Sequence, residues 1–224
     1  MKMLTNNPAA HSRRRLFQIA AAALLSSGLA NGAGGALAAG ASVPIDQLMA
    51  AGALPDLSIG KSDAPVTIVE YASMTCSHCA AFYATTFPVL KSKYIDAGKV
   101  RFILREFPLD PLATAGFMLA RCAGDDKRDA IVDLLFAQQK NWAFTDKPVE
   151  SLANLVKQAG IGQDAFGACL KDQDLYDKIN KVRDRASEKF GVTATPTFFV
   201  NGQKETGEMT PEALDKLLEP LLKS

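Results

Sequence analysis

The chain has 224 residues, of which 48% are hydrophobic and 22% are charged, with 25 basic and 24 acidic side chains. This length allows one domain, or one domain with an insertion, and the composition excludes a disordered chain, a collagen and a disulfide-dense mini-protein. The net charge of +1 argues against a general nucleic-acid binder, which carries a basic excess, so we expect no nucleic acid among its partners.

Residues 1–38 have the pattern of a bacterial secretory signal peptide. The basic segment Ser12–Phe17 precedes the apolar run Ile19–Leu25, and Ala36–Ala38 supplies the small residues of a signal-peptidase site. An N-terminal membrane anchor is the alternative, but the apolar run is too short to span a bilayer. We predict cleavage near Ala38, a periplasmic location and no stable membrane insertion after cleavage.

The arginines of Ser12–Phe17 resemble a twin-arginine signal, which directs export in the folded state, with the Sec route as the alternative. Residues 1–38 hold four of the 25 basic side chains and none of the 24 acidic ones. The mature chain therefore has 21 basic and 24 acidic side chains, a net charge of −3, and one of the two histidines.

Residues 39–62 are rich in turn-forming residues and predict an extended N-terminal arm with one short helical turn. The run Val66–Tyr71 predicts a strand buried on both faces, and Val100–Arg105 predicts a second strand. Between them, Cys76–Tyr94 predicts a helix that is kinked by Pro88. The first half of the mature chain is thus a β-α-β unit.

Residues 110–185 predict an all-helical insertion, because apolar residues recur there at helical spacing and β-branched runs are absent. Near its end, apolar residues three or four positions apart mark the buried face of a helix of about four turns. These residues are Leu175, Ile179, Val182, Ala186 and Phe190.

Strand patterns return at Thr197–Val200, and Asn201-Gly202 then predicts a type I′ hairpin turn into the strand Gln203–Thr206. Thr210 is a good N-cap for a final helix, whose buried stripe consists of leucines. These are Leu214, Leu217, Leu218 and Leu221. The order of elements predicts an α/β fold in which the insertion, 110–185, separates a β-α-β half, 63–109, from a β-β-α half, 186–224.

The segment Cys76-Ser77-His78-Cys79 closes the turn after the first buried strand and begins the first helix. A thiolate at Cys76 is stabilised there by the free N–H groups and the dipole of the helix, and His78 can add charge and a hydrogen bond. Stabilising the thiolate makes the disulfide form a strong oxidant, in an exchange reaction that needs no cofactor and no metal.

Other interpretations of the two cysteines are a structural zinc site and a purely structural disulfide. Zinc requires four ligands, and neither Cys122 nor Cys169 forms a second CxxC pair. A c-type haem is excluded because Ala80, not histidine, follows Cys79. The context of strand, CxxC and helix favours a redox motif.

A second candidate element is Thr195-Pro196, which precedes the third predicted strand. A cis peptide bond there would expose neighbouring backbone groups to an extended peptide. Only about 5–6% of X–Pro bonds in folded proteins are cis, so a trans proline that ends the loop is the alternative.

With these residues in view, the chain from about residue 63 to its C-terminus resembles the DsbA-like branch of the thioredoxin superfamily. The resemblance rests on Cys76–Cys79, Thr195-Pro196 and the hairpin Phe199–Gly202. It implies a thioredoxin fold with an inserted helical domain, an exposed attacking thiol at Cys76 and a buried partner at Cys79. It also implies that Pro196 is cis and faces the disulfide, with Thr195 lining a substrate groove.

Glu70 lies inside the first buried strand, six residues before Cys76. Taken alone, it is an acid at the end of a strand or a partner in an ion pair. The resemblance instead implies a proton acceptor for Cys79, a role that a buried carboxylate with a raised pKa can fill.

Cys122 and Cys169 have three interpretations: a disulfide that joins two helices of the insertion, a resolving or regulatory pair, and two buried thiols. The even number of cysteines in an exported protein favours the structural disulfide.

These features predict a periplasmic thiol:disulfide oxidoreductase that donates its Cys76–Cys79 disulfide to exported, unfolded proteins with free thiols. The resemblance adds a membrane reoxidase as a second partner. A disulfide isomerase or reductase on the same fold is the first alternative, and a chaperone or binding module without redox activity is the second.

Overall fold

The computed structural model describes residues 41–223 of the chain. The predicted signal peptide, its cleavage site near Ala38 and the first two residues of the predicted arm lie outside this range.

A five-stranded mixed sheet forms the centre of the protein, with the order β1-β3-β2-β4-β5. Its strands are β1 (Ser58–Ile59), β2 (Val66–Ala72), β3 (Val100–Glu106), β4 (Thr197–Val200) and β5 (Gln203–Thr206). Strands β2 and β3 are parallel, and β4 is antiparallel to both β2 and β5. This arrangement confirms the β-α-β and β-β-α halves, whereas the short edge strand β1 was not predicted.

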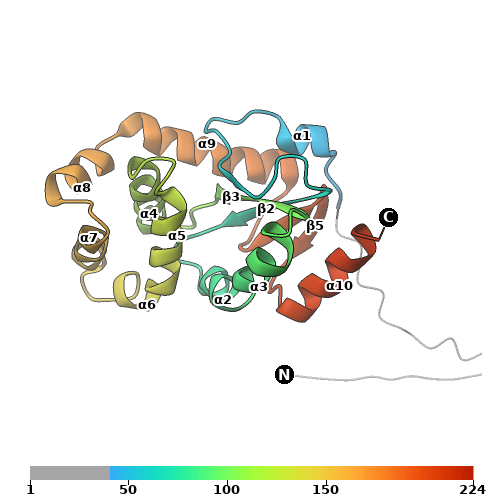
Figure 1. Cartoon of the computed structure of the whole chain (residues 1–224). Helices are drawn as coiled ribbons and strands as arrows, with labels where there is room; N and C mark the ends of the chain where they lie inside the picture. The colour runs from blue at the N-terminus through green and yellow to red at the C-terminus, as the bar shows by residue number, and fades with distance from the viewer. Residues whose placement is uncertain (1–40, 224) are drawn as a thin grey trace, which may run out of the picture. The chain divides into compact units, whose positions relative to one another are not determined.

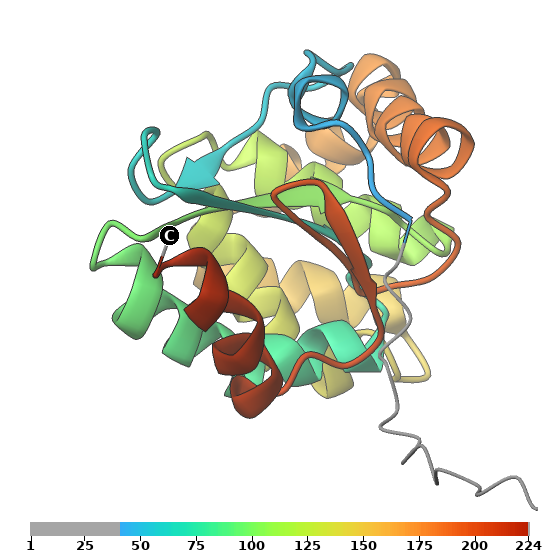
Figure 2. The ribbon, with the colours of Figure 1, turned by 90° about the vertical axis from the view of Figure 1, so that its right-hand side faces the viewer.

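Helices cover both faces of the sheet (Figures 1 and 2). One face carries α2 (Ser77–Thr85), α3 (Phe87–Leu90), the π-helical turn η1 (Lys91–Ile95) and α10 (Pro211–Leu221). The other carries α1 (Ile45–Met49) and α9 (Gln173–Phe190). Because both faces are covered, six of the seven side chains of β2 are buried. No helix within residues 41–223 is both long and apolar enough to cross a membrane.

The segment predicted as one helix over Cys76–Tyr94 is divided into α2, α3 and η1, with the interruption at Thr86. Pro88 causes this change, because it has no N–H to donate and its ring crowds the preceding turn. It is accommodated in the first turn of α3, where a free N–H is not needed.

The helical insertion contains α4 (Pro111–Cys122), α5 (Arg128–Ala137), α6 (Gln139–Trp142), α7 (Pro148–Gln158) and α8 (Gln163–Leu170). The predicted end of the insertion at residue 185 falls inside α9, which continues without a break to Phe190. Its residues Val182, Ala186 and Phe190 pack in the same buried cluster as the strand residues Val69 and Tyr71. The second half of α9 is therefore one of the layers that cover the sheet.

Local signals at the end of the chain are found where they were predicted. Asn201 and Gly202 have φ angles of 47° and 87°, as a type I′ turn requires. The Thr210 hydroxyl accepts a hydrogen bond from the backbone N–H of Ala213 and so caps α10.

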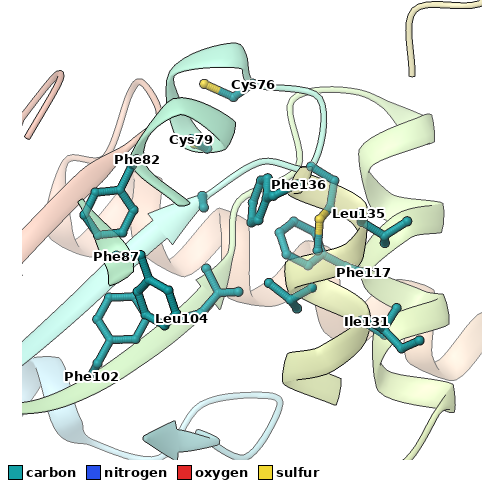
Figure 3. Packing of buried hydrophobic residues seen from close by; sticks show 14 of the residues in the cluster. Cys76, Cys79, Phe82, Phe87, Phe102, Leu104, Phe117, Ile131, Leu135 and Phe136 are labelled. Atoms are coloured by element: carbon teal, nitrogen blue, oxygen red, sulfur yellow. The ribbon is translucent and has the colours of Figure 1, made fainter. Parts of the chain in front are cut away.

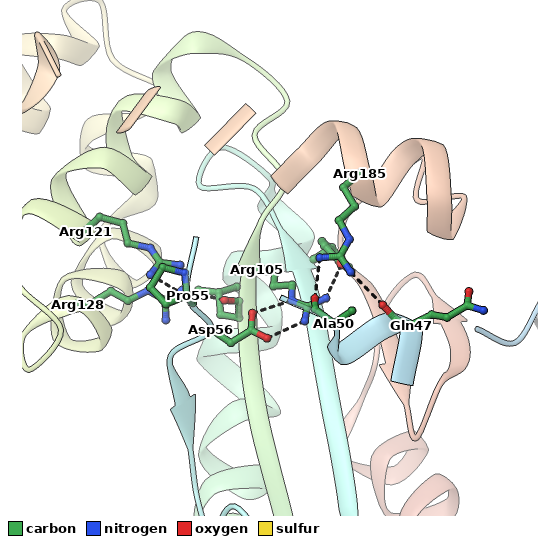
Figure 4. Close-up of polar contacts among 10 residues, drawn as sticks. Gln47, Ala50, Pro55, Asp56, Arg105, Arg121, Arg128 and Arg185 are labelled. Carbon is green, nitrogen blue, oxygen red and sulfur yellow. Dashed lines mark hydrogen bonds and ion pairs between the residues drawn. The ribbon is translucent and has the colours of Figure 1, made fainter. Parts of the chain in front are cut away.

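Arginines hold the N-terminal arm against the rest of the protein (Figure 4). Arg185 of α9 donates to the carbonyl oxygens of Ala50 and Gln47, at 2.8 and 3.0 Å. Arg105 of β3 makes two hydrogen bonds to the Asp56 carboxylate. Within residues 41–62 the arm contains α1, which confirms the predicted short helical turn, and the strand β1.

Candidate active site

Cys76 lies where the chain leaves the buried strand β2 and enters α2. It is the N-cap of α2, and its carbonyl accepts the first helical hydrogen bond from Ala80 N–H at 3.1 Å. The turn before it is closed by a bond from Cys76 N–H to the Ser73 carbonyl. Figure 3 shows Cys76 at the start of α2 and Cys79 one turn further in, above the aromatic core.

The surroundings of the Cys76 sulfur favour its thiolate form. Its pKa is lowered to about 5, mainly by a hydrogen bond from the Cys79 thiol, against the opposing effect of burial. The Thr195 side chain and the backbone N–H groups of Cys79 and His78 lower this pKa further. These backbone groups are the free donors of the first helical turn, which favour an anion.

The expectation of an exposed thiol at Cys76 is wrong. Cys76 is only 8% exposed, because it packs against the loop that contains Thr195, whose carbonyl accepts a 3.3 Å hydrogen bond from the thiol. The backbone N–H of His78 contributes to the lowered Cys76 pKa, and His78 itself is exposed.

Cys79 has the opposite properties, although it is only three residues away. It has no exposed surface, and burial, followed by the hydrogen bond with Cys76 and the charge of Glu70, raises the pKa of its thiol. Both cysteines are free thiols in this structure. The Cys76 thiol therefore ionises far more readily than the Cys79 thiol.

The loop before β4 brings Thr195 and Pro196 to Cys76 across 119 positions of the sequence. The Thr195–Pro196 peptide bond is cis. Pro196 is buried, and β4 begins directly after it and pairs with β2, the strand that leads to Cys76. The loop that the resemblance placed beside the disulfide thus lies against Cys76.

Glu70 lies on the same face of β2 as the buried Ile68 and Ala72, because side chains along a strand alternate between its two faces. That face is covered by α2, which carries Cys79. Glu70 has no exposed surface, and neither of its carboxylate oxygens has a hydrogen-bond partner among the described residues. Burial raises its pKa, and the charge of Cys76 raises it further, whereas the Tyr83 hydroxyl opposes the shift.

Residues that the sequence did not indicate hold the turn in front of Cys76. The Thr75 hydroxyl donates to the Asp110 carboxylate at 2.5 Å, and Asp110 also caps α4 through Ala113 N–H. The Gln139 amide of α6 donates to the carbonyl oxygens of both Met74 and Cys76. No local sequence signal marks Gln139, because its partners lie more than 60 residues away.

Cys122 and Cys169 form a disulfide that joins the C-terminal end of α4 to α8, with their Cα atoms 6.1 Å apart. Of the three interpretations from the sequence, the structure contains the one that joins two helices of the insertion. These cysteines take no part in the arrangement around Cys76 and Cys79.

Residues 53–220 match the sequence family described as Thioredoxin, which is more than half of the chain. The chain therefore belongs to the thioredoxin family. The crystal structure of alpha-DsbA1 from Wolbachia pipientis superposes with a TM-score of 0.72 and 31% identity, over 80% of this chain and 96% of that one. Within the family, the chain is a DsbA-like protein.

Two sequence relatives agree with this placement. A "Putative protein-disulfide oxidoreductase" from Rickettsia bellii is 33% identical over 168 residues, which are 73% of this chain and 65% of that protein. A "Probable disulfide bond formation protein D" from Bacillus anthracis is 31% identical over 173 residues, 74% of this chain and 78% of that protein. The chain thus spans less than two thirds of the length of the Rickettsia relative.

Proposed function

We propose that this protein is a thiol:disulfide oxidoreductase that donates a Cys76–Cys79 disulfide to exported proteins as they fold. One observation carries the proposal: two cysteines one helical turn apart have pKa values shifted in opposite directions, with the low one at the helix N-terminus. Such a pair favours its reduced form, and its disulfide is therefore a strong oxidant.

The reaction proceeds by two exchanges. A substrate thiolate attacks the Cys76 sulfur of the disulfide, the S–S bond breaks, and Cys79 leaves as a thiolate that takes up a proton. A second substrate thiolate then attacks the substrate sulfur of the mixed disulfide and releases Cys76 as a thiolate. The substrate loses two electrons to the cysteine pair, and the stabilised Cys76 thiolate makes the second release favourable.

Glu70 and the Thr195-Pro196 loop have supporting roles in this proposal. In the oxidising direction Glu70 donates the proton that Cys79 takes up, and during reoxidation it accepts that proton again; its burial on the face under α2 supports this role. Thr195 and Pro196 line the surface that receives the substrate, supported by the contact between Thr195 and Cys76.

The proposal also includes the location and the partners. Export to the periplasm is supported by the signal-peptide pattern in residues 1–38 and by the disulfide between Cys122 and Cys169, which suits an oxidising compartment. The substrates are unfolded proteins with free thiols. Each turnover leaves two electrons on Cys76 and Cys79, so a membrane reoxidase that accepts them is the second partner.

The test compares two activities of the purified protein with those of a Cys76→Ala variant. We expect the oxidised wild type to restore disulfides to a reduced, unfolded protein, and the variant, which cannot form the Cys76–Cys79 disulfide, to show no activity above the uncatalysed rate. Activity that survives the substitution would contradict any redox function of this pair and favour a chaperone.

The second activity is the rescue of a substrate with scrambled disulfides, measured together with the reduction potential of the Cys76–Cys79 pair. An oxidase should rescue scrambled disulfides poorly and have a potential well above that of thioredoxin, about −270 mV. Efficient rescue, or a potential near that of thioredoxin, would make the protein an isomerase or a reductase instead.

A further inference from the structure

Gln139 of α6 is a buried polar residue of the helical insertion that contacts the backbone of the active-site turn. Its side chain is 3% exposed. The amide nitrogen donates to the Met74 carbonyl at 2.8 Å and to the Cys76 carbonyl at 2.9 Å, so both N–H groups of the amide are used. Figure 1 shows α6 beside α2, at the border between the insertion and the thioredoxin half.

We propose that Gln139 is a positioning residue for thiol exchange, because its amide holds the Met74–Thr75 and Cys76–Ser77 peptide groups and so fixes the backbone that carries the Cys76 sulfur. The proposal rests on the function proposed above, and it makes the helical insertion a part of the active site.

Packing of the short helix α6 fixes the position of Gln139. It begins α6, a helix of four residues that also contains Trp142. The Trp142 side chain has no exposed surface, and its indole N–H donates to the Leu135 carbonyl of α5 at 2.8 Å. The packing of Trp142 therefore fixes α6 and with it the Gln139 amide. A fixed amide can orient the active-site turn.

The orientation of the Cys76 peptide matters because this residue is the N-cap of α2. Its carbonyl accepts from Ala80 N–H and from Gln139, while its sulfur lies near the N–H groups of His78 and Cys79. If the carbonyl turns, the angle between the sulfur and these donors changes too. Directional hydrogen bonds weaken steeply when their angle is lost.

Gln139 also reduces an unfavourable charge. The Cys76 carbonyl oxygen carries partial negative charge on the same residue as the thiolate, and the amide hydrogens compensate for it. Without the amide, the Met74 carbonyl would lose its Gln139 partner inside the protein, where Met74 has no exposed surface. The compensation of charge acts on the thiolate and not on a disulfide, whereas the lost hydrogen bond to Met74 would cost both forms alike.

The test uses two variants and a matched control. Gln139→Met removes both donors at similar volume, and Gln139→Glu keeps the shape but points a carboxylate at two carbonyl oxygens. Gln138→Met is the control, because the neighbouring Gln138 side chain accepts a hydrogen bond from Asn141 on the outside of α6. In each protein, the thiolate absorbance of Cys76 is titrated with pH, and the equilibrium with glutathione is measured.

We expect the pKa of Cys76 to rise by about one unit in Gln139→Met, the worth of one or two hydrogen bonds, and by more in Gln139→Glu. The equilibrium with glutathione should then shift about tenfold toward the disulfide form of this protein. The pKa should stay unchanged in Gln138→Met.

An unchanged Cys76 pKa in a folded Gln139 variant would overturn the proposal, even if the melting temperature falls. A purely structural role would lower the stability of the oxidised and reduced forms equally, whereas positioning lowers that of the reduced form more. If Gln139→Met does not fold, the isosteric Gln139→Glu gives the same comparison. The titration does not depend on oxidase activity, so it stays decisive even if the proposed function is wrong.

Discussion

Glu70 is a carboxyl group in surroundings that oppose its charge. It has no exposed surface, its oxygens have no hydrogen-bond partner among the described residues, and its pKa is raised by burial. A raised pKa in the folded state stabilises the protein at a pH below the unfolded value, near 4.5, and this contribution is lost as the pH rises through the folded value. Glu70 should therefore destabilise the fold at neutral and alkaline pH.

We expect Glu70→Gln to stabilise the oxidised protein by more than about 1 kcal/mol at pH 8, the worth of roughly one pKa unit. The difference should vanish below pH 4.5, where the carboxyl group is protonated in both states. Denaturant unfolding at several pH values measures it, with Glu188→Gln, an exposed position on α9, as the control. A pH-independent difference would show that the pKa of Glu70 is the same in the folded and unfolded states.

The same variant tests the proton transfer proposed for Glu70. If Glu70 exchanges a proton with Cys79, resolution of the mixed disulfide should slow in Glu70→Gln, and its dependence on pH should change. A rate equal to that of the wild type across the pH range would remove this role.

At the scale of elements, α9 shows how one helix serves two parts of the protein. It begins at an Asp172 cap beside the insertion, and its second half packs on the sheet and holds the N-terminal arm. The Arg185 guanidinium also lies 5.3 Å from the centre of the Phe190 ring. The arm is thus attached through hydrogen bonds from a helix more than 130 residues away.

Arg185→Ala should lower the free energy of unfolding by about 1–2 kcal/mol, since it removes two hydrogen bonds to the carbonyl oxygens of Gln47 and Ala50. It should also make the arm more sensitive to limited proteolysis near these residues. The control is Arg183→Ala on the same helix, whose ion pair with Asp184 is exposed and worth little. Equal effects of the two substitutions would show that Arg185 does not hold the arm.

At the scale of the whole molecule, the insertion is joined within itself by a disulfide and to the active site by hydrogen bonds. The Cys122–Cys169 bond connects residues 47 positions apart and restricts the unfolded chain, while Gln139 and Asp110 bring the insertion to the turn before Cys76. Removing the disulfide should therefore lower the stability of the protein without changing the reactivity of Cys76.

The double variant Cys122→Ala, Cys169→Ala tests this separation. We expect the free energy of unfolding to fall by about 2–4 kcal/mol, because a loop of this length is no longer closed in the unfolded state. The pKa of Cys76 should not change, since the groups that set it lie in α2, the Thr195 loop and α6, and the disulfide joins α4 to α8. Mass spectrometry after alkylation of the wild type checks the bond itself. Two alkylated thiols at these positions, or unchanged stability, would contradict the structural role.

Several features were predictable from the sequence because their causes are local. The buried strand before Cys76, the helix that begins there, the Asn201-Gly202 turn and the Thr210 cap each depend on residues only a few positions apart. The β-α-β and β-β-α order follows from such segments, and so does the placing of a CxxC pair at a helix N-terminus. The sequence by itself thus determined the fold class and the place of the CxxC pair at the start of α2.

The tertiary structure decided which groups contact the sulfurs of Cys76 and Cys79 and how deeply each sulfur is buried. Three sets of contacts join residues more than 60 positions apart: Thr195 with Cys76, Gln139 with the active-site turn, and Arg185 with the arm. The first of them also explains why Cys76 has little exposed surface. Such contacts depend on how helices and strands pack against each other, and no local pattern encodes that packing. The environment that lowers one thiol pKa and raises the other is therefore a property of the folded molecule.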